Sequence, residues 1–391
     1  MNAPRASRSW FGLALLLLPL LVSFAPVGHA QDAEPTPPTA DGLPEVGYVE
    51  GRILELAPAS RGTPIGAGGM ALVRLGDGSL VNAVVPSTDD LGATTVEAYR
   101  VGDRVELYYA PAPGGTVREY VVVDWIRRPA LYLLVGLFLL VSVAVARLKG
   151  LRAFVATGVS LAIIVTFIVP RILDGWNPML VTLLGVGGIL VLAIYFVHGL
   201  TWSTTAALAG TMAAVVVTMA LGVSFTHFAH LTGFGSEEAM LITFSAEQVD
   251  LRGLLLAGLL IGALGALTDI TIVQASVVRE LAHVNPSFAW SELYRRGMNV
   301  GLDHIGSLVN TLVLAYVGAG LPLLVLLRVG DYGWGRALNI EQVAAEVVHT
   351  LVGSIGLILG VPITTALAAA MFRGGRLKLR EGELDHAHHH H

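Results

Sequence analysis

Apolar segments of membrane-spanning length fill the chain from residue 129 onward. A helix needs about 20 consecutive apolar residues to cross the hydrocarbon core of a bilayer. This core contains no water, so the backbone groups must bond one another within the helix. Only 14% of the residues are charged, against about a quarter in soluble domains. The sequence therefore predicts a mainly α polytopic membrane protein with about seven transmembrane helices. We expect the spans at 130–147, 152–170, 178–197, 203–222, 252–273, 303–325 and 349–371.

The first 30 residues have the pattern of a signal peptide. Arg5 and Arg8 precede a short apolar stretch, and Gly28-His29-Ala30 provides the small residues that a signal peptidase prefers. The alternative is an uncleaved anchor helix. Residues 31–45 are rich in Pro, Asp, Glu and Thr, which predicts a disordered linker.

Residues 46–127 predict a small extracytoplasmic β-domain. Short runs of alternating polar and apolar residues indicate five or so strands, and Gly76-Asp77-Gly78-Ser79 predicts a hairpin turn. So many strands in about 80 residues favour a closed barrel, OB-like or SH3-like. The pattern shows no catalytic constellation and gives the domain no identifiable role.

The distribution of Lys and Arg predicts the orientation of the helical domain, residues 128–372. With seven spans, three basic clusters fall on one side, which is then the cytoplasm: Arg147, Lys149 and Arg152; Arg279, Arg295 and Arg296; and Arg373, Arg376, Lys378 and Arg380. The chain is then expected in a bacterial inner (plasma) membrane, with the β-domain outside and the C-terminus in the cytoplasm. The alternative is that span six is broken at Gly318, Gly320 and Pro322, which would give eight spans.

The amino-acid composition mainly excludes certain kinds of site. The sequence has no cysteine, which rules out disulfides, thiolate metal sites and cysteine nucleophiles. Residues 373–391 form a cytoplasmic tail whose histidine run, 388–391, is typical of an expression tag. The net charge of -5 does not favour nucleic acid as a partner, and no cofactor is indicated.

An aspartate in span five is the clearest candidate for chemistry within the membrane. Asp269 follows a glycine-rich stretch and Thr268. An ionisable side chain in lipid is costly unless it is paired or lines a wet cavity. We therefore consider a proton or cation site at Asp269, with Thr268 and Thr271 as oxygen partners. The alternative is an N-cap, at which Thr268-Asp269 begins a second helical segment after a glycine-softened break.

Span six carries a second group of polar residues. Asp303, Ser307 and Asn310 have helical spacings of four and three, so they share one face, and Thr311 follows them. Together with Asp269 they could form a polar track for ions. The alternative is that they only link helices by hydrogen bonds. The neighbouring His304 is more typical of an interfacial residue than of a ligand.

Two further segments carry weaker signals. His227 and His230 form an HxxH pair that could bind a metal with Glu237, although this motif alone is not specific. Residues 285–298 predict a separate amphipathic helix at the cytoplasmic membrane surface, with Ser287 as its N-cap. Asn177-Pro178 predicts the start of the third span, with Asn as N-cap and Pro at the first helical position.

Several of these residues occur in strings that resemble the YibE/F family of bacterial membrane proteins. The resemblance lies in Gly262 to Asp269 and the following helix, in the string from Gly301 to Pro322, and in Gly353 to Gly356. His304 departs from the aliphatic residue expected at its position. The resemblance implies a multi-span protein but no settled biochemical activity. A fainter similarity to the cores of SecD/SecF-type and resistance-nodulation-division permeases implies an intramembrane carboxylate that couples proton flow to work.

These features favour a membrane permease of unknown substrate, coupled to protons or cations through Asp269. The alternative is a non-transporting scaffold or receptor whose β-domain binds an envelope partner. No HExxH or GxSxG motif is present, so an enzyme is not expected. The expected partners are the lipid bilayer and an unidentified small solute or ion, and the pattern leaves a homo-oligomer open.

Overall fold

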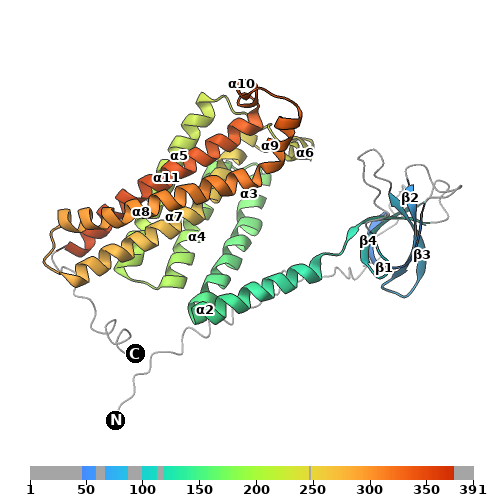
Figure 1. Ribbon diagram of the computed structural model, residues 1–391, viewed down its shortest axis with the longest axis horizontal. Helices are drawn as coiled ribbons and strands as arrows, with labels where there is room; N and C mark the ends of the chain where they lie inside the picture. The colour runs from blue at the N-terminus through green and yellow to red at the C-terminus, as the bar shows by residue number, and fades with distance from the viewer. Residues whose placement is uncertain (1–45, 59–66, 87–98, 112–117, 246–247, 374–391) are drawn as a thin grey trace, which may run out of the picture. The chain divides into compact units, whose positions relative to one another are not determined.

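The computed structural model describes residues 46–58, 67–86, 99–111, 118–245 and 248–373 (Figure 1). The expected signal peptide and linker lie outside these residues, as does the tail beyond Arg373. The chain divides into two compact units, Met1–Val141 and Ser142–His391. Each unit has its own hydrophobic core and is described separately.

The first unit contains a closed five-stranded barrel. Its strands, in the order β1-β2-β3-β5-β4, are β1 Gly47–Pro58, β2 Ala67–Leu75, β3 Leu80–Pro86, β4 Arg104–Pro111 and β5 Arg118–Trp125. β1 also pairs with β4, which closes the barrel, and β3 runs parallel to β5. Of the two expected barrels, this strand order matches the OB-like one.

Alternation of side chains builds the interior of this barrel. Ile53, Val73, Val85 and Leu107 are fully buried, whereas their neighbours along each strand face outward. The ring of Tyr99 stacks on Trp125 with a centroid distance of 4.1 Å, and burial raises the pKa of the Tyr99 hydroxyl. The expected hairpin turn is confirmed, with Gly78 at φ 87°. The alternating pattern of residues 99–109 does not form one strand, because Gly102, at φ 100°, forms a turn and β4 begins only at Arg104.

Within the residues that the structure describes, six helices are long and apolar enough to cross a membrane. They comprise the continuous stretch Arg128–Leu173, then α4 Pro178–His198, α5 Trp202–Phe228, α7 Leu251–Val284, α8 Trp290–Ala319 and α11 Glu341–Phe372. The shorter elements are α6 Glu237–Ser245, α9 Leu321–Val329 and α10 Trp334–Ala337. The membrane class and the mainly helical fold are thereby confirmed, with the number of spans close to the expected seven.

The count depends on the first of these helices, which is 46 residues long. It consists of α2 Arg128–Ile163, the π-helical turn η3 Ile164–Ile168 and α3 Val169–Leu173. Its backbone leaves the helical region at Arg147, where φ is 51° and ψ is -131°. The chain bends sharply here, as the close approach of Gly150 to Ser142 shows: a Cβ added at Gly150 would overlap the main-chain carbonyl of Ser142. The interruption falls between the first two predicted spans. Arg128–Leu173 is counted as one helix but covers both of them.

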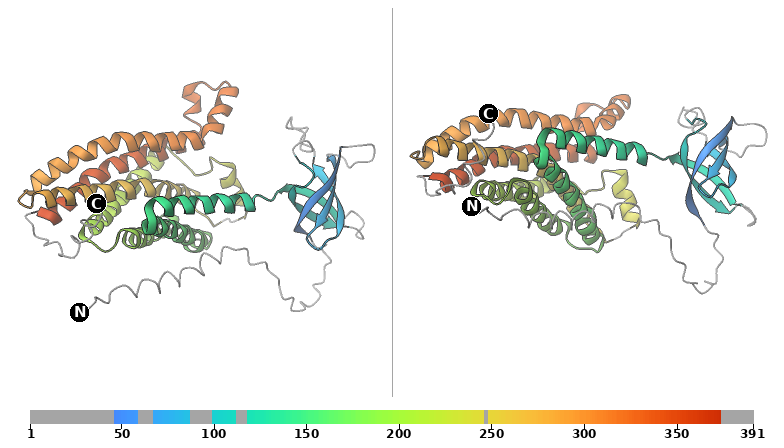
Figure 2. Two further views of the ribbon diagram at one scale, coloured as in Figure 1. Left: turned by 60° about the horizontal axis from the view of Figure 1, so that its bottom comes forward. Right: turned by 90° about the horizontal axis from the view of Figure 1, so that it is seen from below.

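Three helices form the centre of the second unit. α11 packs against α5, α7 and α8, and α5 also packs against α7 (Figures 1 and 2). Their shared core is apolar and includes the fully buried Val215, Leu267 and Leu357. α4 begins as expected, since Asn177 Oδ1 accepts hydrogen bonds from the amides of Met179 and Leu180. α4 then packs on α7.

Two boundary predictions are wrong. The predicted amphipathic helix at 285–298 is not separate, because α8 runs without a break from Trp290 to Ala319, and Ser287 lies in the turn before it. The sixth span therefore begins earlier than predicted. It also ends earlier, at Gly320, after which α9 forms a separate short helix. The predicted break near Pro322 is thus present, but α9 is too short to be counted as an eighth span.

Candidate functional site

Asp269 lies within an uninterrupted helix. α7 is continuous from Leu251 to Val284, so the alternative that Asp269 caps a second helical segment does not hold. Its side chain is exposed on the outer face of α7, whereas the adjacent Ile270 and Thr271 are buried. The expected oxygen partners bond elsewhere: Thr268 donates to the Leu264 carbonyl and Thr271 to the Thr268 carbonyl. The imidazole of His198 lies close enough to Asp269 for their charges to interact.

The polar residues of α8 do not join Asp269 in a single track. Asp303, Ser307, Asn310 and Thr311 are all exposed on α8. The face that α8 buries against its neighbours instead includes Gly297, Gly301 and Leu312. In the part of the chain that the structure describes, no hydrogen bond or ion pair joins the four exposed side chains to Asp269. His304, next to Asp303, is also exposed and contacts the Val300 carbonyl at 3.3 Å.

The polar groups that the helices do bring together lie in the core. The hydroxyls of Thr211 on α5 and Thr271 on α7 are 2.6 Å apart. Gln274 is 1% exposed, and its side-chain nitrogen donates to the Thr365 hydroxyl on α11 at 2.7 Å and to the Gly297 carbonyl on α8 at 2.8 Å. We did not single out Gln274 from the sequence. Its neutral amide in an apolar helix is the signal that could have identified it as an interhelical donor.

A cavity of about 290 Å³ lies where α4 turns into α5. Its wall carries basic side chains from three helices: Lys149 and Arg152 of α2, the imidazole of His198 of α4 and Arg279 of α7. Hydroxyls of Thr201, Ser203, Thr204 and Ser276 complete the polar lining. No carboxylate belongs to the described residues that line it. Asp269 lies just beyond, since positions 269, 272, 276 and 279 fall on one face of α7.

The floor of this cavity is a turn fixed by hydrogen bonds. Gly199 ends α4 at φ 80°, a conformation that glycine adopts without strain. Thr201 and Thr204 form a capping box at the start of α5, in which each side chain bonds the backbone amide of the other. The Thr204 hydroxyl also donates to the Gly199 carbonyl at 2.8 Å. The groups that line the cavity are therefore held by an ordered backbone.

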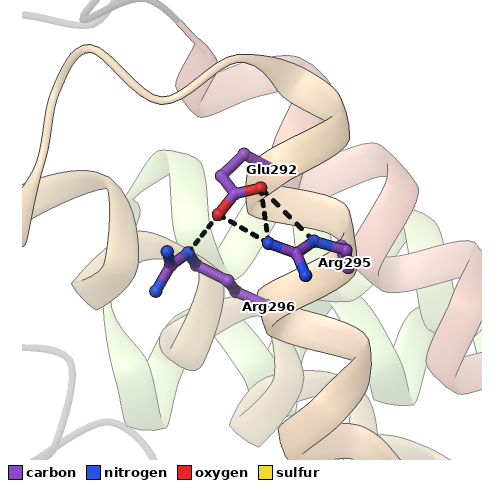
Figure 3. A network of polar contacts seen from close by, with 3 residues as sticks. All are labelled: Glu292, Arg295 and Arg296. Carbon is purple, nitrogen blue, oxygen red and sulfur yellow. Dashed lines mark hydrogen bonds and ion pairs between the residues drawn. The ribbon is translucent and has the colours of Figure 1, made fainter.

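The positive charges of this cavity are poorly compensated. Elsewhere on the same unit, Arg295 and Arg296 both bond the carboxylate of Glu292 (Figure 3). Arg279 pairs with Glu280, at 2.8 Å. Lys149 and Arg152 form no ion pair with any residue that the structure describes. Of the three Lys and Arg side chains in the cavity, Arg279 has a carboxylate partner, whereas Lys149 and Arg152 have none among the described residues.

The expected metal site is not assembled among the described residues. His227 lies in the last turn of α5 and His230 just after it, at φ 53°, and both are exposed. The side chain of Glu237 lies outside what the structure describes. No group of three or more His, Cys, Asp or Glu side chains that could hold a metal ion occurs in the described ranges.

The fold defines the class: a helical membrane protein with a small N-terminal β-barrel. A family model described as YibE/F-like protein matches residues 134–374, and the chain belongs to this family. The resemblance seen in the sequence is thereby confirmed for the helical domain. No curated protein and no solved structure gives a significant match. The fainter similarity to SecD/SecF-type permeases gains no support from these comparisons.

Proposed function

We propose that this protein is a membrane permease in which Asp269 binds a proton or another cation. The position of Asp269 is the observation that carries the proposal. Its carboxyl group lies about 27 Å along α7 from Leu251, counting 1.5 Å per residue, with helix continuing on both sides. No backbone cap accounts for a carboxylate there. A charged group at such a depth is costly unless it is neutralised, paired or hydrated.

The surroundings of Asp269 suit reversible cation binding. Gly265, one turn away on the same face of α7, has open space where a Cβ would lie. His198 is close enough to interact, and it also lines the polar cavity at the α4–α5 turn. Binding of a proton or cation would neutralise Asp269 and remove its attraction to His198. A change of that interaction can shift the balance between two packings of α4 and α7.

The arrangement of basic residues supports a cytoplasmic location for the cavity end. Lys149 and Arg152 share the cavity with Arg279, although they are far apart in the sequence. Trp290, near the start of α8, donates to the Ala366 carbonyl near the end of α11, at 3.1 Å. These contacts bring members of the predicted basic clusters to the same end. We infer that this end faces the cytoplasm and that the β-barrel lies outside.

The test is an Asp269→Asn exchange in the full chain, reconstituted in vesicles. We expect the exchange to abolish proton or cation flux driven by a pH gradient, because the amide keeps the shape but cannot be protonated reversibly. Flux is followed with a pH-sensitive dye inside the vesicles and with a panel of monovalent cations. Asp303→Asn is the matched control, since it makes the same chemical change on the exposed face of α8.

Unchanged flux in a correctly folded Asp269→Asn protein would contradict the permease. Equal losses in Asp269→Asn and Asp303→Asn would contradict the assignment to Asp269. The remaining function would then be that of a scaffold or receptor. That alternative is favoured by the barrel, which has a closed core of its own, and it predicts retention of an envelope partner by both variants.

A further inference from the structure

The cavity at the α4–α5 turn has the chemistry of an anion-binding site. Cationic groups converge on it from α2 and α7, and the described residues that line it include no carboxylate. Lysine and arginine side chains are the usual ligands of phosphate groups in proteins, and arginine can bind them with two parallel hydrogen bonds. A cavity of about 290 Å³ is large enough to admit such a group.

Uncharged donors in the cavity are also available. Ser203 is only 3% exposed, yet its hydroxyl makes no hydrogen bond with any described residue. This hydroxyl lies in the wall of the cavity, where it is free to bond a ligand. Ser276 on the opposite wall likewise bonds none of the described residues. The hydroxyls of Thr201 and Thr204 are instead engaged in the turn.

Two of the positive charges can act on a ligand without breaking an ion pair, whereas Arg279 would share its guanidinium with Glu280. Lys149 and Arg152 have no ion-pair partner within the described ranges, in contrast to Arg295 and Arg296, which share Glu292 (Figure 3). Bringing like charges together costs free energy, and a bound anion offsets that cost. The start of α5 adds the partial positive charge of a helix N-terminus.

Apolar residues beside the cavity indicate where it opens. Leu200 and Trp202 flank Thr201 in the turn and are 76% and 56% exposed. Tryptophan at such a position is typical of the membrane–water interface. Basic pockets between transmembrane helices at that level bind the head groups of anionic lipids.

We propose that this cavity binds a phosphate group, with Lys149, Arg152 and Arg279 as the charged ligands and the Ser203 hydroxyl as a neutral donor. The phosphate is carried either by an anionic phospholipid at the membrane surface or by a soluble phosphorylated compound. The proposal does not depend on a coupling role for Asp269. Its test is a binding measurement, so its failure is distinguishable from a failure of the flux experiment.

Binding is measured with the full chain in nanodiscs, with intrinsic tryptophan fluorescence and thermal melting as readouts. One arm compares discs of phosphatidylcholine with discs that contain phosphatidylglycerol. The other arm adds inorganic phosphate to the phosphatidylcholine discs. A response to phosphatidylglycerol alone identifies a lipid head group, and a saturable response to inorganic phosphate identifies a soluble ligand; both support the proposal. No response in either arm overturns it.

The variant that tests the site is Lys149→Gln with Arg152→Gln. Since hydrogen bonds to charged groups contribute about 1.5–3 kcal/mol, we expect affinity to fall about tenfold or more. Arg295→Gln with Arg296→Gln is the matched control, because it removes the same charge from cations that already have a partner. Equal losses in the two double variants would show general attraction to the charged surface and would overturn the site.

A third variant, Ser203→Ala, separates a built site from a patch of charge. Its hydroxyl has no partner to lose among the described residues, so the fold should be unaffected. We expect affinity to fall about threefold to tenfold, the range for one neutral hydrogen bond. Unchanged affinity with unchanged melting would remove Ser203 from the proposed site.

Discussion

The core between α5, α7 and α11 and the cavity at the α4–α5 turn both contain polar side chains, but they use them in opposite ways. In the core, Thr211 bonds Thr271, and Gln274 bonds Thr365 and the α8 backbone, although the buried Thr364 hydroxyl of α11 has no partner among the described residues. In the cavity, Lys149, Arg152 and Ser203 have no partner that the structure describes. Groups that satisfy one another stabilise helix packing, whereas unsatisfied groups are available to a ligand. The polar residues to test for function in this membrane domain are therefore those of the cavity rather than the bonded ones of the core.

The largest effect is expected where the core is tightest, at Gly356 of α11. A Cβ at this position would overlap the hydroxyl of Thr218 on α5, and that side chain is held by its bond to the Ala214 carbonyl. Gly356→Leu should therefore lower the free energy of unfolding by about 3 kcal/mol or more. The measurement is thermal unfolding of the detergent-solubilised chain, followed by helical circular dichroism.

Two control experiments test whether the effect is specific to Gly356. Gly265→Ala, at a position with open space, should change the free energy of unfolding by less than about 0.5 kcal/mol. Gly356→Ala should cost less when combined with Thr218→Ala, because the second exchange removes the overlapping hydroxyl. Additive losses in that pair would show that the two helices do not meet as described.

A smaller loss is expected for Gln274→Leu. The exchange places an apolar side chain in this buried position and removes the hydrogen bonds to Thr365 and Gly297. We expect a loss of about 1–2 kcal/mol in the free energy of unfolding, measured in the same way. Val273→Leu, at the adjacent exposed position on α7, is the control. An unchanged melting temperature for Gln274→Leu would mean that the core polar groups do not stabilise packing.

The smallest effect is expected in the cavity, for Lys149→Gln. No described partner is lost and repulsion from the neighbouring cations is relieved, so stability should stay within about 0.5 kcal/mol or rise slightly. Glu292→Gln is the contrasting exchange, because it leaves Arg295 and Arg296 without their shared carboxylate and should lower the melting temperature. If Lys149→Gln proved as destabilising as Gln274→Leu, the distinction between the two regions would fail.

Much of the fold follows from local patterns in the sequence. Apolar length gives the spans, alternation gives the strands, and Asn177-Pro178 marks the start of α4, because each of these depends on residues near one another in the chain. The boundaries of α8 were less predictable. Residues 290–302 are amphipathic and the following ones apolar, and the sequence does not show that one helix continues through both.

The candidate site was predictable only in part. Asp269 is recognisable as a carboxylate in an apolar stretch, but the direction of a side chain depends on how each helix is rotated against its neighbours. That rotation turns Asp303, Ser307 and Asn310 outward and prevents the expected track. The cavity combines residues 149, 152, 198 and 279. The sequence assigned residues 149, 152 and 279 to one side of the membrane, which showed that these three could meet but not that they form a site with His198.

The left-handed backbone at Arg147 has a consequence for how the chain enters a bilayer. A straight helix of 46 residues would be about 69 Å long, more than twice the thickness of the hydrocarbon layer. The interruption divides it into two shorter helical stretches, each of about the length that crosses that layer, with Gly150 against Ser142 near the bend. A left-handed conformation costs a non-glycine residue about 1 kcal/mol or more, yet arginine occupies the bend. Its guanidinium prefers the head-group layer, so we expect the bend to lie at that level of the bilayer.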